Sequence, residues 1–136
     1  MTRRLPDAKD WRNRDIDDWN TTTFTSYMAD KHREEFGCEY VPMRNWGFEQ
    51  GQIGRLIGTK TKEGTTSKAV VKRFIDEAFA EYKPTKDWPG TSFGFIYSYR
   101  RNILQRVQAE ESEKVRREER AAEVEDVSYD DLSDWL

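Results

Sequence analysis

The sequence predicts a mainly α-helical protein: a small domain of about four helices with a helix-loop-helix at its centre, then an extended charged helix and an acidic tail. Apolar residues recur at the i, i+3, i+4 spacing of amphipathic helices, most clearly over residues 67–82. Glycine, proline and capping residues separate these segments. Only 35% of the 136 residues are hydrophobic, whereas 36% are charged and 13% are aromatic. The ordered core is therefore expected to be smaller than the chain.

The chain divides into four parts by composition. Residues 1–19 are mostly charged and lack a helical period, so we interpret them as an N-terminal arm, anchored by Trp11, Ile16 and Trp19. The helical domain is predicted over residues 20–107. A charged helical extension over 108–124 and an acidic tail over 125–136 follow it.

The first predicted helix is capped by Asn20 or Thr21 and runs to about Phe36, where Gly37 ends it. The extended segment 38–42 that follows is either a strand or a buried connection. A second helix begins at Trp46 and runs to Ile57. It contains the sequence GQIGRLIG, which lacks the Gly-Lys-Ser/Thr ending and the preceding strand of a phosphate-binding loop.

The strongest helical pattern begins after Ser67, which is placed as its cap, and ends before Pro84. A turn over residues 87–90 separates it from the last helix. Thr91 or Ser92 starts that helix, and its apolar face continues to Val107. Beyond Val107 the helical pattern persists without an apolar face, which indicates a solvent-exposed extension to about Glu123.

Charge is unevenly distributed along the chain. Residues 1–107 contain 19 basic and 15 acidic residues, and residues 108–136 contain 4 basic and 11 acidic residues. The net charge of −3 therefore hides a basic body and an acidic tail. Such a separation suits a body that meets a polyanion and a tail that meets something else, although both surfaces can also be simply solvated.

Few residues suit catalysis or metal binding. Cys38 is the only cysteine and His32 the only histidine, too few for a disulfide framework or a zinc site. We expect His32 on the polar side of its helix, Cys38 as a small buried residue, and the pair Asp76–Glu77 on a solvated face. The sequence thus predicts a protein that is not an enzyme and uses no cofactor or metal.

No apolar run approaches the ~20 residues that a membrane-spanning helix needs, and no signal peptide follows Met1. We therefore expect no membrane contact and a cytoplasmic location.

A diffuse set of basic residues predicts contact with nucleic acid. If the helices form a small bundle, these residues can line one surface and neutralise phosphates, and Tyr97 or Tyr99 can stack on bases of a single strand. The alternative is that they are ordinary solvated surface residues, and nothing indicates base-specific recognition. The candidates are Arg55, Lys60, Lys62, Lys72, Arg73, Arg100, Arg101 and Arg106.

The tail has the most distinctive pattern. It is rich in aspartate and finishes on bulky apolar residues, a composition suited to an apolar pocket with a basic rim. We predict that it binds a partner protein through Tyr129, Leu132, Asp134, Trp135 and Leu136.

The sequence YDDLSDWL over residues 129–136 resembles the C-terminal sliding-clamp-binding peptides of T-even-type phages. Such peptides occur on the phage DNA polymerase and on the late-transcription sigma factor and coactivator. Leu132, Asp134, Trp135 and Leu136 match their leucine, acidic, aromatic and leucine positions, with Ser133 as an additional residue. The tail also resembles, more loosely, the acidic tails of phage single-stranded-DNA-binding proteins.

The body, from Tyr40 to Phe95, resembles small helical proteins of unassigned role encoded by tailed phages. These resemblances imply a non-enzymatic phage adaptor of DNA replication or late transcription, monomeric when free and located in the host cytoplasm. Its body would contact nucleic acid or a polymerase subunit, and its tail a sliding clamp or a similar pocket. Two alternatives are an inhibitor of a host nucleic-acid enzyme with a DNA-mimicking tail, and a structural or assembly protein.

Overall fold

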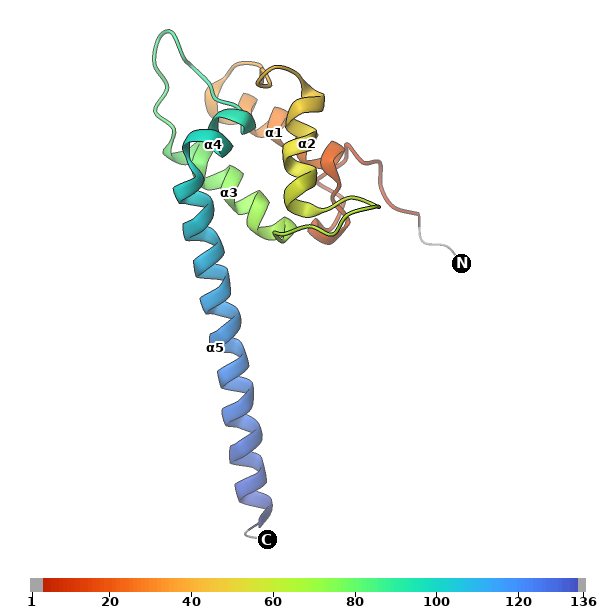
Figure 1. The fold of residues 1–136 in the computed structure, drawn as a ribbon, viewed down its shortest axis with the longest axis vertical. Coiled ribbons are helices and arrows are strands. Elements are labelled where there is room, and N and C mark those ends of the chain that lie inside the picture. The colour runs from red at the N-terminus through yellow and green to blue at the C-terminus, as the bar shows by residue number, and fades with distance from the viewer. Residues whose placement is uncertain (1–3, 135–136) are drawn as a thin grey trace.

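The computed structural model describes the backbone of residues 4–134 and the side chains of residues 4–124. A short 3₁₀ helix, η1, precedes five α-helices (Figure 1). Over these residues the chain forms no strand, only one isolated bridge between Gly58 and Glu63. The mainly α-helical class predicted from the sequence is confirmed. The elements are η1 (Ile16–Asp18), α1 (Thr21–Phe36), α2 (Trp46–Ile57), α3 (Lys68–Glu81), α4 (Phe93–Tyr99) and α5 (Arg101–Asp134).

Local capping defines where the helices begin. The Asn20 side chain accepts a hydrogen bond from the Thr23 amide in a reciprocal capping box, and Ser67 accepts from the Val70 amide. Gly37 ends α1 at φ 68°, the left-handed conformation that glycine adopts without a steric penalty. Ser92, one of the two predicted caps, accepts from the Phe95 amide at the start of α4. The predicted helix starts are therefore confirmed within one residue.

The N-terminal arm is held against the body by its aromatic residues. Trp19 is buried, and Trp11 and Ile16 pack against the core, as predicted. The Trp11 indole also donates to the Asp30 carboxylate on α1, at 2.7 Å. The arm therefore covers one side of α1, and Trp19 belongs to the core itself.

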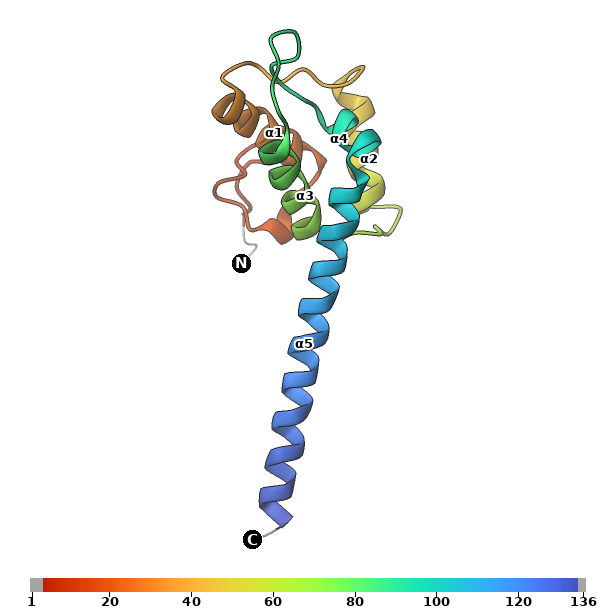
Figure 2. The same cartoon turned by 90° about the vertical axis from the view of Figure 1, so that its left-hand side faces the viewer.

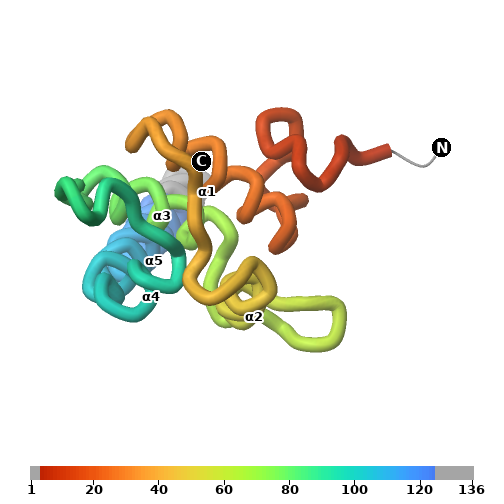
Figure 3. The backbone as a smooth tube through the Cα atoms, turned by 90° about the horizontal axis from the view of Figure 1, so that it is seen from above, coloured from red at the N-terminus to blue at the C-terminus, as the bar shows by residue number. Residues whose placement is uncertain are grey.

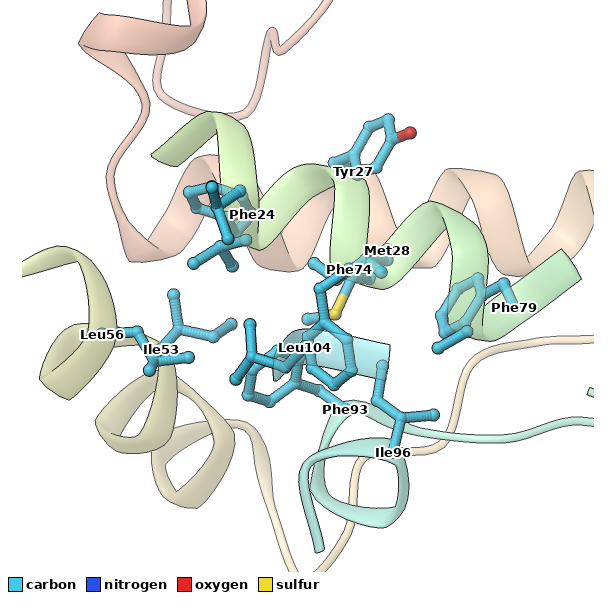
Figure 4. Packing of buried hydrophobic residues seen from close by; sticks show 14 of the residues in the cluster. Phe24, Tyr27, Met28, Ile53, Leu56, Phe74, Phe79, Phe93, Ile96 and Leu104 are labelled. Carbon is cyan, nitrogen blue, oxygen red and sulfur yellow. The ribbon is translucent and has the colours of Figure 1, made fainter. Parts of the chain in front are cut away.

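All five helices contribute to one hydrophobic core. Figure 4 shows side chains of α1 to α5 converging, with Phe74 of α3, Phe93 of α4 and Leu104 of α5 close to its middle. The rings of Phe74 and Phe93 meet edge to face, with centroids 6.1 Å apart. This packing fixes α3, α4 and α5 against one another.

The last helix is broken, which corrects the predicted single helix from residue 91 or 92 onward. Arg100 ends α4 with a non-helical backbone (φ −126°, ψ 30°), and α5 begins at the next residue. In one straight helix Arg100 would lie on the apolar stripe between Ile96 and Ile103, both of which are buried. The break instead leaves Arg100 exposed to solvent.

Helix α5 leaves the body and projects as a single rod (Figures 1 and 2). Its last buried residue is Val107, and the side chains from Ser112 to Val124 are exposed. The helix continues through Asp134, ten residues past the predicted end of the charged extension at 124. The N-terminal ten of the twelve residues predicted as a tail therefore have a helical backbone.

Residues 38–42, predicted as a strand or a buried connection, form no strand. Tyr40 is buried within this segment, so the second alternative holds for that residue.

At the end of α2, Gly58 has φ 91°, and a Cβ there would meet the Gly64 backbone at 2.6 Å. Glycine at this position allows two backbone segments to approach closely.

Among the described residues no helix combines the length and apolar character needed to cross a membrane.

Asp76 of α3 lies in a contact that the sequence did not predict. The Tyr27 hydroxyl of α1 donates to the Asp76 carboxylate, and Lys72 pairs with the same carboxylate at 2.9 Å. Asp76 is thus half-buried between α1 and α3, not on a solvated face. Burial, followed by the hydrogen bond to Asp76, raises the pKa of the Tyr27 phenol above its ordinary value.

This raised pKa predicts a loss of stability in alkali. The unfolded chain releases the Tyr27 proton above about pH 10, whereas the folded chain retains it, so the stabilisation is complete below that pH and falls as the pH rises further. Between about pH 9 and pH 11 the free energy of unfolding should fall less in Tyr27→Phe than in the wild type. Urea unfolding at each pH measures this quantity. Tyr99→Phe, at an exposed tyrosine, should behave as the wild type. Equal losses in Tyr27→Phe and the wild type would contradict this account.

Candidate functional site

An apolar groove of about 800 Å³ lies at the end of the body opposite the one from which α5 projects (Figure 1). Three segments form it: the connection between α1 and α2, the long loop between α3 and α4, and α4 itself. The loop is the tall excursion at the upper left of Figure 1. The lining residues are His32, Cys38, Glu39, Val41, Met43, Tyr82, Thr85, Trp88, Pro89, Gly90, Thr91, Ser92, Phe95 and Tyr99.

Large apolar side chains on the groove walls remain open to solvent. Val41 is 73% exposed, Trp88 72% and Tyr99 64%. Clustered exposed hydrophobic residues of this size are uncommon on a soluble surface and indicate a binding site. The groove volume lies within the range of ordinary ligand sites.

His32 joins two of the groove's segments from behind. Its Nε2 accepts a hydrogen bond from the Thr91 amide at 3.2 Å, so its Nδ1 carries the hydrogen and donates to the Cys38 carbonyl at 3.1 Å. The imidazole therefore ties α1 to residue 38 and to the chain just before α4.

The expected surface position of His32 is wrong, because the side chain is only 2% exposed. His32 lies four residues from both Met28 and Phe36, on the same stripe as Phe24. This spacing indicates that His32 lies on the buried side of the helix, whereas its charged sequence neighbours favoured the polar side. Cys38 is half-buried on the groove wall, less buried than expected.

A buried carboxylate holds the start of α4. Glu49 of α2 is completely buried. Its Oε1 accepts from the Tyr40 hydroxyl at 2.5 Å, and its Oε2 accepts from the amides of Met43 at 2.9 Å and Gly94 at 2.8 Å. The Phe93 amide donates to the Tyr40 oxygen at 2.7 Å, so both groups engage backbone amides at the first turn of α4. Burial and the adjacent Glu49 raise the pKa of Tyr40.

Glu49 is not among the residues singled out from the sequence. The residue lies four positions before Ile53 on α2, so it shares the buried side of that helix. An acidic residue on an apolar stripe is the signal that identifies it.

One polar atom of the groove wall has no partner. Thr91 is 9% exposed and lines the groove, and its Oγ1 makes no hydrogen bond with any described residue. Buried hydroxyls normally find a partner. This hydroxyl is a buried polar atom behind the groove surface, without a partner among the described residues.

Basic side chains flank the groove at the corner between α4 and α5. The Arg100 guanidinium lies 5.8 Å from the centre of the Phe95 ring, and Arg101 lies 4.2 Å from that of Tyr97. Lys83 and Lys86 are exposed on the loop between α3 and α4.

Three of the eight predicted nucleic-acid contacts are paired with carboxylates. Lys72 pairs with Asp76 and lies 5.0 Å from the centre of the Tyr27 ring. Arg73 and Arg106 join α3 to α5 in one ionic network. In it, Arg73 pairs with Glu77, Glu110 and Glu111, and Arg106 pairs with Glu77, Glu81 and Glu110. Glu77, predicted on a solvated face, is half-buried and takes part in this network.

The other five lie in two separate places. Arg55 is exposed on α2, and Lys60 and Lys62 are exposed on the loop that follows it. Seen from above, that loop points away from α4 and α5, beside which Arg100 and Arg101 lie (Figure 3). The structure therefore does not bring the eight residues together on one surface, and nucleic-acid binding stays a prediction.

The predicted partner-binding residues lie outside the described side chains. Tyr129, Leu132 and Asp134 belong to the part of α5 described by its backbone alone, and Trp135 and Leu136 lie beyond the described residues. Within residues 4–124 no group of three or more histidine, cysteine, aspartate or glutamate side chains is placed to hold a metal ion.

Comparison of the chain with protein-family models, with curated proteins and with solved structures gave no match.

Glu49 is expected to be the most sensitive polar position of the body. Glu49→Gln keeps the size of the side chain but replaces one acceptor oxygen with a donor that faces an amide or hydroxyl. We expect the free energy of unfolding to fall by about 2–4 kcal/mol, measured by urea unfolding followed by circular dichroism. Glu118→Gln, at an exposed position of α5, should change it by less than about 0.5 kcal/mol. Similar values for the two variants would show that the buried carboxylate contributes little.

Two glycine-to-alanine substitutions should change stability in opposite directions. A Cβ at Gly90 would overlap the His32 ring, whereas a Cβ at Gly51, inside α2, meets nothing within 4 Å. We expect Gly90→Ala to destabilise the protein by about 1–3 kcal/mol. Gly51→Ala should stabilise it by about 0.5–1 kcal/mol, because alanine favours the helix. Thermal unfolding measures both, and a neutral Gly90→Ala would show that the groove is not closely packed behind Gly90.

Proposed function

We propose that this chain is a non-enzymatic adaptor of phage DNA replication or late transcription. In this proposal the helical body contacts nucleic acid or a polymerase subunit, and the segment 125–136 binds a sliding clamp or a comparable pocket. The observation that supports it most is the projection of α5, which carries its C-terminal segment away from the body (Figure 2).

The exposed part of α5 has the properties of a spacer. From Val107, its last buried residue, to Asp134 the helix is about 40 Å long at 1.5 Å per residue. Its surface is charged, with an ion pair between Arg120 and Glu113 at 3.3 Å. A solvated rod of this kind suits the separation of two binding ends better than the formation of a core.

The two ends differ in chemistry. Residues 125–136 contain five acidic and no basic residues, with Leu132, Trp135 and Leu136 as large apolar residues. This composition fits an apolar pocket with a basic rim, and its resemblance to clamp-binding peptides makes the clamp our proposed partner. At the body, Arg55, Lys60 and Lys62 are exposed, and within the described residues none of them pairs with a carboxylate. They are the proposed contacts to phosphate groups or to an acidic protein surface.

The proposal predicts that the tail and the body bind independently. Purified full-length protein should bind an immobilised T-even-type sliding clamp in surface plasmon resonance. The double variant Trp135→Ala/Leu136→Ala should lose at least about tenfold in affinity, because it removes the apolar anchors. Ser128→Ala is the matched control and should bind as the wild type.

Added DNA provides a second arm of the experiment. Clamp binding through the tail should persist in the presence of DNA. A tail that mimics nucleic acid would instead be displaced by DNA from its partner. No binding of the wild type, or equal binding of the double variant, would contradict the clamp as partner.

A further inference from the structure

We infer that the apolar groove of the body receives the acidic tail, residues 125–136, of a second copy of this chain, in a dimer with antiparallel α5 helices. The groove and the tail are separate features of one chain: the groove has exposed apolar side chains, and the tail contains Leu132, Trp135 and Leu136. The inference goes beyond the proposed function. Only its consequence, that a docked tail is withheld from its partner protein, rests on that proposal.

Charge favours this occupant. Over residues 82–101, which supply most of the groove wall, there are four basic residues (Lys83, Lys86, Arg100 and Arg101) and one acidic residue, Asp87. The tail has acidic residues and no basic ones. Opposite charges around an apolar contact favour encounter and fix its register.

The lining favours a hydrophobic peptide over a nucleic acid. Among the lining residues only Glu39 has a formal charge, so the wall itself offers no cation to a phosphate group, and Val41, Met43 and Pro89 form aliphatic parts of the wall. Trp135 and the two leucines of the tail are side chains that such a groove can bury.

Helix length excludes docking within one chain. The 34 residues of α5 extend about 50 Å, so Asp134 lies far from Arg101 and from the groove beside it. When two α5 helices lie side by side in opposite directions, the end of each comes beside the start of the other. Tyr99, a lining residue of the groove, lies two positions before the first residue of α5, so the end of the second copy then points toward the groove. Both contacts form at once through a two-fold axis.

Sedimentation velocity of the full-length chain over a range of micromolar concentrations tests this inference. We expect a concentration-dependent monomer–dimer equilibrium. A tail variant, Trp135→Ala/Leu136→Ala, and a groove variant, Trp88→Ala/Tyr99→Ala, should each weaken it at least tenfold. Trp88 and Tyr99 are largely exposed, so their replacement should leave the fold intact, as circular dichroism can verify. Leu5→Ala, at an exposed apolar residue outside the groove, is the matched control.

Mixing the two variants distinguishes tail docking from other dimers. A tail variant and a groove variant together retain one intact tail–groove contact, so they should form heterodimers more readily than either variant forms homodimers. A dimer held by α5 packing alone would not respond to the groove substitutions, and that result would overturn the inference.

A labelled peptide of residues 125–136 provides a direct readout by fluorescence anisotropy. It should bind the full-length tail variant, whose groove is intact, and a peptide of the same composition in scrambled order should bind at least tenfold more weakly. Failure of the 125–136 peptide to bind would overturn the inference, as would a groove that binds a single-stranded oligonucleotide in its place. Neither result bears on clamp binding, so failure here is distinguishable from failure of the proposed function.

Discussion

The buried carboxylate of Glu49 is the interaction on which the placement of α4 depends. Helix α4 has seven residues, too few to be stable without tertiary contacts. Glu49 accepts a hydrogen bond from the Gly94 amide, and it holds the Phe93 amide indirectly, through the Tyr40 hydroxyl. Its contact with the Met43 amide fixes the connection before α2. A charged group buried in this way is stabilising only while its hydrogen-bond partners are complete. The contact therefore joins two segments that are about 45 residues apart in the sequence.

The groove is a consequence of the same contacts. Its walls are the segments that Glu49 and His32 connect: residues 38–43, the loop before α4, and α4. Glu49 holds the beginning of α4, and His32 holds the end of the loop before it through the Thr91 amide. Because these ties exist within the chain itself, the apolar surface is formed before any partner arrives. A preformed site has less conformational entropy to lose on binding.

The features that could be predicted from the sequence are those that depend on nearby residues. The capping roles of Asn20 and Ser67 and the stop at Gly37 are local, and the helix starts agreed closely. The break at Arg100 and the burial of His32 and Glu49 depend on residues elsewhere in the chain, although the position of each on an apolar stripe carried part of the signal. The groove had no such signal, because its walls come from three segments whose proximity only the tertiary structure provides.

Ion pairing within the body reduces the number of basic side chains that are available to a partner. Arg73 and Arg106 are counted as basic in the sequence, but both are used to hold α5 against α3, so the cationic surface available to partners is smaller than composition suggests. What remains is a molecule with an apolar groove at one end and acidic, apolar residues at the other. Such complementary ends form open filaments when the contact between copies does not close. The length of α5 would permit closure, because in the proposed antiparallel dimer both ends are occupied at once and neither is free to propagate.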